Sequence, residues 1–364
     1  MSKPRLFYSI IKQYANFATL LFYRRLKVNN LKNVPKDGPV IFVPNHQNAF
    51  MDAIVTTVVS SRNPWFLTRA SVFGSATARY WLNLLQMIPI YRFRDGLQNV
   101  KRNDETMDLS LNILSNEGTI LIFAEGNHDY RWSLRPLQKG LARMSFAFES
   151  ASDFTNGLQI VPVGLQYENH NQFRSELLIN FGEPIKVADY KAIYQADPIR
   201  ATTKLLEDVS QNLGSLILNI RDIEMHDKIK SAIKARAGRE SDLVKRLQSD
   251  KQFLKEGKFP VNKQKKPKLL LGIVGFPVFL YGAINNLIIF LIIKYIMKKF
   301  IKDAHWTASI KFAGMILISP IIYLLQTIVI GTIFPDLACV AAYFVSLPIS
   351  AVLAGDYFHT VLKP

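Results

Sequence analysis

The sequence has 364 residues and only one cysteine, Cys339, which lies in an apolar run. A single cysteine forms no intrachain disulfide and builds no cysteine-rich metal site. The sequence also lacks a phosphate-cradling loop of the G-x-x-x-x-G-K type and any group of residues with the spacing of metal ligands along the chain. From the sequence we therefore expect no metal site and no cofactor.

A secretory signal peptide is also missing. The apolar stretch near the N-terminus is interrupted by Lys12, Gln13 and Asn16, and no small-residue cleavage site follows it. Apolar and aromatic residues recur there at helical spacing with basic residues on both sides, which is typical of a helix in the membrane interface. The same pattern suits a helix packed on the protein's own core, so both interpretations of residues 1–27 stay open.

Negative charge is scarce relative to positive charge. Lys and Arg number 45 against 28 Asp and Glu, which gives a net charge of +17, and 49% of the residues are hydrophobic. Excess positive charge favours anionic partners such as nucleic acid, lipid headgroups or phosphorylated substrates. No RRM, zinc-finger or helix-turn-helix signature is present, whereas long apolar runs are, so we expect a membrane bilayer as partner and no nucleic acid.

Residues 28–195 alternate between β-branched apolar runs and amphipathic stretches. This alternation predicts an α/β domain with a mixed, largely buried sheet flanked by helices, in which functional residues gather at strand ends. The expected strands are about 39–43, 63–70, 87–92, 119–126, 157–167 and 177–184, and the expected helices are 50–60, 73–86, 98–116 and 140–149.

The composition changes after this domain. Residues 196–257 are charged and helical in pattern, which indicates an accessory helical segment. A basic linker, 258–268, precedes apolar runs within 269–357 that predict C-terminal α-helical membrane segments. We therefore expect an integral membrane protein.

The first apolar run, 269–301, is interrupted by Pro277 and by Asn285 and Asn286, and it has lysines on both sides. A single crossing would place one lysine cluster on the unfavourable side, so we expect a hairpin that enters the membrane and returns. The later apolar runs can also go out and back, which gives an even number of passes and a catalytic domain that faces the cytoplasm. One long tilted helix over 269–301 is the alternative.

The stretch V-P-N-H-Q-N-A-F-M-D-A-I, residues 43–54, places His46 and Asp52 where a strand gives way to a loop and a helix. A histidine takes a proton from a hydroxyl when a carboxylate fixes its tautomer and supports the imidazolium. No serine or cysteine nucleophile lies nearby, so the pair predicts direct activation of a substrate hydroxyl. A purely structural His–Asp pair is the alternative.

Three further segments follow in the order I-P-x-Y-R, F-x-E-G and V-P-V-G, each at or after a predicted strand. The cations after the second segment are either ligands of a phosphate or CoA group or plain surface charge. The residues of interest are Arg92 and Arg94 in the first segment, Glu125, Gly126, Arg131, Arg135 and Lys139 in and after the second, and Pro162 and Gly164 in the third.

Together with N-H-x5-D, these segments resemble the four ordered blocks of the glycerolipid acyltransferase superfamily, the family of bacterial lysophosphatidate acyltransferase. The stretch E-G-N-H-D-Y-R-W-S-L-R-P-L-Q-K-G is most similar to the yeast-type glycerol-3-phosphate/dihydroxyacetone-phosphate acyltransferases. The resemblance covers about residues 28–190. Ala124 and Asn127 depart from the usual F-P-E-G-T, and the spacer between His46 and Asp52 is one residue longer than in the bacterial enzymes.

The resemblance implies a membrane-bound O-acyltransferase of phospholipid synthesis with a glycerol-3-phosphate acyltransferase-like fold. It would transfer an acyl group from acyl-CoA or acyl-carrier protein to glycerol-3-phosphate or 1-acyl-sn-glycerol-3-phosphate. It implies His46 as general base, Asp52 as its orienting partner, and backbone N–H groups near the motif loops as oxyanion donors. The implied substrate-binding residues are Arg92 for the phosphate, Glu125, Gly126 and Arg131 near it, and Pro162 and Gly164 on the acyl side.

Two alternatives stay open. The same chemistry would serve another lysolipid, such as an amino-acid lysolipid, and Arg92 would then be dispensable. A non-catalytic scaffold that binds membrane lipid would keep the fold and tolerate the loss of His46.

Overall fold

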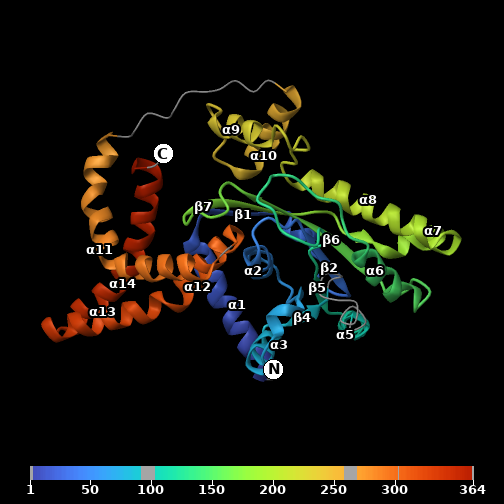
Figure 1. The fold of residues 1–364 in the computed structure, drawn as a ribbon, viewed down its shortest axis with the longest axis horizontal. Helices are drawn as coiled ribbons and strands as arrows, with labels where there is room; N and C mark the ends of the chain where they lie inside the picture. Colours follow the sequence, from blue (N-terminus) through green and yellow to red (C-terminus); the bar gives the residue numbers. More distant parts are fainter. Residues whose placement is uncertain (1–2, 92–102, 258–268, 302, 363–364) are drawn as a thin grey trace.

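The computed structural model describes residues 3–91, 103–257, 269–301 and 303–362 (Figure 1). One mixed sheet organises the first half of the chain, with the strand order β1-β7-β6-β2-β5-β3-β4 and β8 beside β6. β2 is parallel to β5 and β6, whereas β7 and β8 run antiparallel to β6. The predicted mixed sheet is therefore confirmed. The strands are β1 Tyr23–Asn29, β2 Val40–Pro44, β3 Trp65–Arg69, β4 Met87–Ile90, β5 Thr119–Leu121, β6 Gln159–Tyr167, β7 Ser175–Phe181 and β8 Ile185–Lys186.

Helices cover both faces of this sheet because its central strands are apolar on both sides. In β2, Val40 and Phe42 point to one layer and Ile41 and Val43 to the other, and all four are fully buried. The first layer holds α1, α2 and, from the C-terminal region, α12 (Thr307–Leu317), and the second holds α5, α6 and α8. The helices of the α/β domain are α1 Lys3–Phe22, α2 Phe50–Val59, α3 Ala76–Leu84, α5 Asn103–Ser115, α6 Gly140–Ser150, α7 Lys191–Ala196 and α8 Pro198–Leu216, with short 3-10 turns η1 Leu31–Asn33, η2 Ala70–Phe73 and η4 Val187–Tyr190.

Two of the predicted domain boundaries are wrong. β1 begins at Tyr23 and pairs with β7, so a boundary between residues 27 and 28 falls inside a strand. Helix α8 packs Ala201 and Leu205 against the sheet, so it belongs to the α/β domain. Only α9 (His226–Ala235) and α10 (Leu243–Glu256) form a separate helical unit, beside the edge made by β1 and β7.

Helix α1 has one buried face and one exposed apolar face. Tyr8 and Phe22 are buried in the protein, whereas Leu6, Ile10 and Phe17 are each more than half exposed. The helix therefore packs on the core with one face and presents an apolar face outward, as an interfacial helix does.

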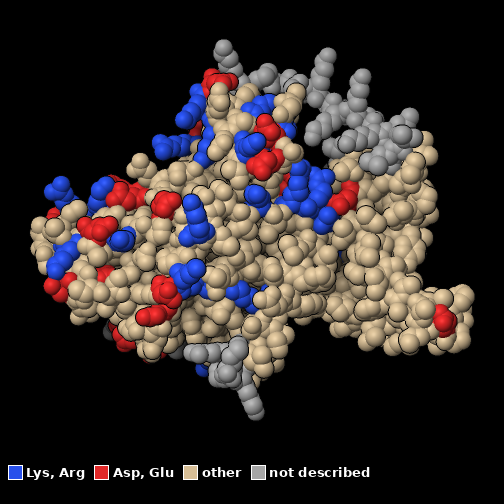
Figure 2. Space-filling view, turned by 180° about the vertical axis from the view of Figure 1, so that it is seen from behind, with Lys and Arg blue, Asp and Glu red and all other residues tan. Residues whose placement is uncertain are grey.

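The C-terminal region consists of α11 (Leu269–Phe300), η5 (Ala304–Trp306), α12 (Thr307–Leu317), α13 (Ser319–Ile333), α14 (Leu337–Tyr357) and a final π-helical turn, η6 (Phe358–Leu362). By length and composition, three segments could cross a membrane: Gly272–Phe300, Ala304–Ile333 and Leu337–Leu362. Figure 2 shows one face of the molecule, on which charged side chains gather outside the C-terminal helices. The C-terminal helices themselves are almost entirely tan on this face, the colour of uncharged residues.

The predicted hairpin within 269–301 is wrong, because α11 is one continuous helix with Pro277 inside it. The amides of Asn285 and Asn286 donate to carbonyl groups four residues earlier, so these residues stay helical. Their side-chain oxygens accept the hydroxyls of Tyr343 at 2.7 Å and Tyr323 at 2.6 Å, which join α11 to α14 and α13. With one helix in place of a hairpin, an even number of passes no longer follows.

The membrane region is attached to the α/β domain by polar contacts. The hydroxyl of Tyr14 donates to the carbonyl oxygen of Ile316 at 2.7 Å, which joins α1 to α12. Arg174, just before β7, forms a 2.9 Å ion pair with Asp356 near the end of α14. The two parts therefore pack as one molecule, and α12 contacts both α1 and α2.

Candidate active site

The loop after β2 brings His46 to Asp52 in the first turn of α2. Nδ1 of His46 lies 2.9 Å from Oδ2 of Asp52. Ala49, between them, has a positive φ of 45°, a conformation that turns the chain sharply. This turn accommodates the spacer of five residues between the two side chains.

The carboxylate of Asp52 is fully buried and accepts hydrogen bonds on both oxygens. Oδ2 also accepts the backbone N–H groups of Gln47 at 2.8 Å and Asn48 at 2.7 Å, and Oδ1 accepts the hydroxyl of Tyr167 at 2.7 Å. Burial and the charge of Asp52 raise the pKa of Tyr167 well above its ordinary value, so this hydroxyl keeps its proton. The two backbone N–H groups are engaged by Asp52 and are not available to an oxyanion.

The contact with Asp52 fixes the tautomer and the plane of the His46 ring. Because the carboxylate accepts, Nδ1 carries the proton and Nε2 presents its lone pair. Within the part of the chain that the structure describes, Nε2 has no hydrogen-bond partner, and 12% of the side chain is exposed. The ring stacks on Phe123 with a centroid distance of 3.8 Å. This imidazole is placed to act as a base on a hydroxyl that enters from outside.

Glu125 and Arg135 brace the loop that carries His46. Oε1 of Glu125 accepts the backbone N–H of His46 at 2.6 Å, and Oε2 accepts the backbone N–H and Nε of Arg135 at 3.0 and 2.9 Å. Nη2 of Arg135 donates to the carbonyl oxygen of His46 at 3.1 Å. Burial raises the pKa of Glu125, and Arg135 and the two N–H donors oppose that shift. Both oxygens of Glu125 are thus occupied by protein donors, so Glu125 positions His46.

The other residues singled out from the sequence lie in different surroundings. Gly126 has a φ of 78°, which glycine adopts without strain and which lets the chain turn after Glu125. Pro162 and Gly164 are buried within β6, and a Cβ on Gly164 would come within 2.5 Å of Cβ of Leu216 in α8. Two arginines, Arg92 and Arg94, lie outside the described residues, as does the predicted linker 258–268.

A groove of about 1540 Å³ opens between the segment 129–139, α8 and α10. In its wall, Nε of Arg131 donates to Asp129 at 2.9 Å, and the backbone N–H of Asp129 donates to the His46 carbonyl at 3.1 Å. The groove therefore begins at the loop that carries His46. Its charged lining is mainly basic, with Arg131, Arg135, Lys139, Arg221, Lys251 and Lys255 against Asp129 and Glu207.

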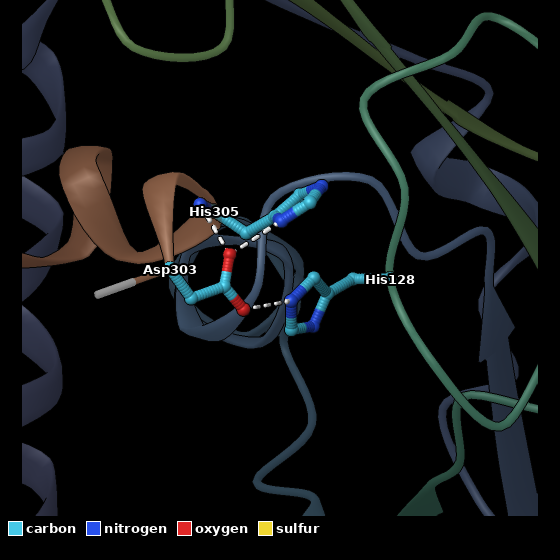
Figure 3. A group of neighbouring side chains, drawn as sticks. All are labelled: His128, Asp303 and His305. Atoms are coloured by element: carbon cyan, nitrogen blue, oxygen red, sulfur yellow. Dashed lines mark hydrogen bonds and ion pairs between the residues drawn. The ribbon is translucent and has the colours of Figure 1, made fainter. Parts of the chain in front are cut away.

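The structure adds Tyr167, Asp303 and His305, which the spacing of motifs did not reveal, and it shows what His128 of the E-G-N-H-D stretch contacts. Tyr167 ends β6, the parallel neighbour of β2, so it lies at the same sheet edge as His46. His128 lies edge-on to His46 with a centroid distance of 5.3 Å, and it approaches Asp303 and His305 near the start of α12 (Figure 3). Strand order and helix docking decide these contacts, and neither can be read from local spacing.

Part of the chain is similar to known proteins. Residues 25–166 match the acyltransferase family. The match covers less than half of the chain, so the similarity to this family concerns the domain that carries His46 and Asp52. The described residues that the sequence singled out for the site, from His46 to Gly164, all lie within the matched segment. Tyr167 directly follows it, and Asp303 and His305 lie in the C-terminal region.

Two relatives are enzymes of Saccharomyces cerevisiae. The chain is 34% identical over 131 residues to glycerol-3-phosphate O-acyltransferase 2, and 31% identical over 114 residues to glycerol-3-phosphate O-acyltransferase 1. These matches cover 36% and 30% of this chain but only 18% and 15% of the yeast proteins, so the chain spans less than a fifth of their length. The 1-acyl-sn-glycerophosphate (LPA) acyltransferase of Thermotoga maritima has 16% identity and a TM-score of 0.42, over 58% of this chain and 80% of that one.

Proposed function

We propose that this protein is a membrane-bound O-acyltransferase that acylates a glycerol-phosphate hydroxyl, that of glycerol-3-phosphate or of 1-acyl-sn-glycerol-3-phosphate. The observation that carries the proposal is the His46 ring, whose Nδ1 is held by the buried carboxylate of Asp52 while Nε2 is left without a partner among the described residues. A base arranged in this way acts on a substrate hydroxyl. The yeast relatives are glycerol-3-phosphate O-acyltransferases, which supports this class of acceptor.

The reaction follows from that geometry. Nε2 of His46 takes the hydroxyl proton as the substrate oxygen attacks the thioester carbonyl carbon, and the buried carboxylate of Asp52 stabilises the imidazolium. The tetrahedral intermediate then collapses, the C–S bond breaks, and the thiolate receives the proton from His46. General base catalysis of this kind contributes roughly 10²–10⁴-fold to the rate.

The basic groove supports an acyl-CoA donor. It begins beside the His46 loop, and Arg131, Lys251 and Lys255 in its walls present the cationic donors that phosphate groups prefer. Replacing Lys251 and Lys255 by Gln should raise the KM for acyl-CoA several-fold and leave the KM for the acceptor unchanged. An unchanged KM for acyl-CoA would show that the acyl donor does not bind in this groove. It would favour another thioester donor, such as acyl-carrier protein.

A membrane location supports a lipid acceptor. Three C-terminal segments are long and apolar enough to span a bilayer, and α1 exposes Leu6, Ile10 and Phe17. We place the α/β domain on the cytoplasmic surface, where a lysolipid dissolved in the bilayer would reach His46 laterally and excess positive charge would be attracted by anionic headgroups.

Acyl transfer from labelled acyl-CoA to the two glycerol-phosphate acceptors, measured in vesicles, tests the proposal. Wild-type protein should form product with one of them, and His46→Ala should lose it, whereas His359→Ala in the C-terminal turn should keep it. Product that survives His46→Ala would contradict the mechanism. A folded wild-type protein active only on an amino-acid lysolipid would change the acceptor class, and one inactive on all acceptors and donors would favour a lipid-binding scaffold.

A further inference from the structure

A second polar cluster lies beside the His46 ring and joins distant parts of the chain. Nε2 of His128 lies 3.6 Å from Oδ2 of Asp303, and Nδ1 of His305 lies 2.6 Å from Oδ1 of the same carboxylate. One ligand atom from each residue lies within 4.8 Å of the other two (Figure 3). We propose that these three side chains bind a divalent cation of the zinc class.

The chemistry of the donors fits such an ion. Two imidazole nitrogens and one carboxylate oxygen form a common protein ligand set for zinc and similar transition metals, which can keep a water in the remaining position. Ligand atoms of a tetrahedral zinc site lie roughly 3.4 Å apart, so the His128–Asp303 separation needs little change. The proton shared by His305 and Asp303 would leave for solvent as the ion binds.

The cluster is partly ordered and still accessible. Oδ1 of Asp303 accepts the backbone N–H of His305 at 2.9 Å, a capping contact that orients the carboxylate and leaves Oδ2 toward His128. Half of the Asp303 side chain and 31% of the His305 side chain are exposed. An ion can therefore enter from solvent, and the side chains have room to close around it.

A bound ion would tie the membrane region to the rim of the active site. His128 belongs to the segment that follows β5 and contacts His46. Asp303 directly precedes a segment that could cross the membrane, and His305 is its second residue. The hydroxyl of Tyr130 already donates to the carbonyl oxygen of Ala304 at 2.6 Å, so the two parts meet at this point before an ion binds. This inference does not depend on the acyl-transfer proposal.

Cobalt titration of the full-length, tag-free protein in lipid nanodiscs tests the site after metal has been removed with a chelator. Co²⁺ should bind with one equivalent, a Kd below about 10 µM and d–d absorption bands, and Zn²⁺ should displace it and raise the Tm. His128→Ala, His305→Ala and Asp303→Asn should each weaken binding at least ~10-fold. An Asn at residue 303 can still cap the turn, so Asp303→Asn removes the metal-binding carboxylate without removing the cap.

His359→Ala is the matched control, because it removes a histidine of the C-terminal region that is not in the cluster. It should bind Co²⁺ like the wild type. Wild-type protein that unfolds cooperatively but shows no saturable Co²⁺ binding would overturn the inference. Binding that persists unchanged in all three cluster variants would overturn it as well. Acyl transfer enters neither readout, so an inactive protein would still give a decisive result.

Discussion

The hydroxyl of Tyr167 donates a 2.7 Å hydrogen bond to Oδ1 of Asp52, while Oδ2 of the same carboxylate accepts from His46. Tyr167 and Asp52 are both fully buried. Tyr167 ends β6, and Asp52 lies in the first turn of α2, the helix that follows the parallel neighbour of β6, β2. The last residue of β6 therefore orients the carboxylate that orients the proposed base.

Tyr167→Phe should lower kcat, with a smaller effect on KM, and should reduce the free energy of unfolding. The phenyl ring keeps the packing, but Oδ1 of Asp52 loses its hydroxyl donor, at a cost of about 1.5–3 kcal/mol for a hydrogen bond to a charged group. Steady-state kinetics and thermal unfolding measure the two effects. Tyr190→Phe is the control, because its hydroxyl donates to Asp208 away from the site, and it should affect stability alone. Equal kcat values for the two variants would contradict an orienting role for Tyr167.

Asp52→Asn should reduce kcat by roughly 10²–10⁴-fold. The amide cannot stabilise the imidazolium, and two backbone N–H groups that now bind the carboxylate compete for its one oxygen. Single-turnover acyl transfer measures the chemical step directly. Asp153→Asn, at a surface ion pair with Lys191, serves as the control and should retain full activity. A wild-type rate in Asp52→Asn would show that the His46–Asp52 contact is only structural.

Arg135→Lys should impair the enzyme more than Arg131→Lys. The guanidinium of Arg135 reaches both Glu125 and the His46 carbonyl, and an ammonium group cannot bridge these two acceptors in the same geometry. We expect kcat to fall about tenfold, which corresponds to ~1.4 kcal/mol, with a lower Tm. Arg131 pairs with Asp129 at the groove, so its replacement should leave kcat nearly unchanged. The reverse order of effects would rule out the bracing role of Arg135.

Glu176 gives the protein a stability that depends on pH. Burial raises the pKa of this carboxyl, but hydrogen bonds from Arg246 and Arg24 outweigh burial and lower it from 4.5 to about 2. A lowered pKa in the folded state stabilises the protein above 4.5, and this contribution is lost as the pH falls toward 2. Glu176→Gln should therefore lower the Tm strongly near neutral pH and much less in acid. A Tm difference that is the same in acid as at neutral pH would contradict the assignment.

Gly282→Ala should destabilise the membrane region. A Cβ at residue 282 of α11 would collide with the carbonyl oxygen of Ser350 and lie 2.8 Å from Cβ of Ala354, both in α14. Overpacking of this kind costs about 1–3 kcal/mol. Gly331→Ala in α13 is the matched control, because its Cβ would meet only Val340 at an ordinary 3.5 Å. Thermal unfolding in detergent should separate the two variants, and equal Tm values would exclude close packing of α11 on α14.

Local patterns in the sequence were enough to predict the α/β domain and the location of the proposed base. Runs such as V-I-F-V in β2 are apolar at every position because both faces of the strand are buried. His46 and Asp52 are close in sequence, so one loop and one helical turn suffice to bring them together. The apolar C-terminal runs predicted membrane helices because a bilayer span requires about 20 such residues.

The contacts between distant segments depend on the three-dimensional fold and could not be predicted from local patterns. The polar strand β1 and the pairing of β6 with β2 depend on the order of strands in the sheet, which local patterns do not record. Helix α11 runs unbroken through Asn285 and Asn286, whose side-chain oxygens accept hydroxyls from α14 and α13, and these partners are far away in the sequence. The Glu125–Arg135 brace and the cluster of His128 with Asp303 likewise join residues that only the folded chain brings within hydrogen-bond or ion-pair range.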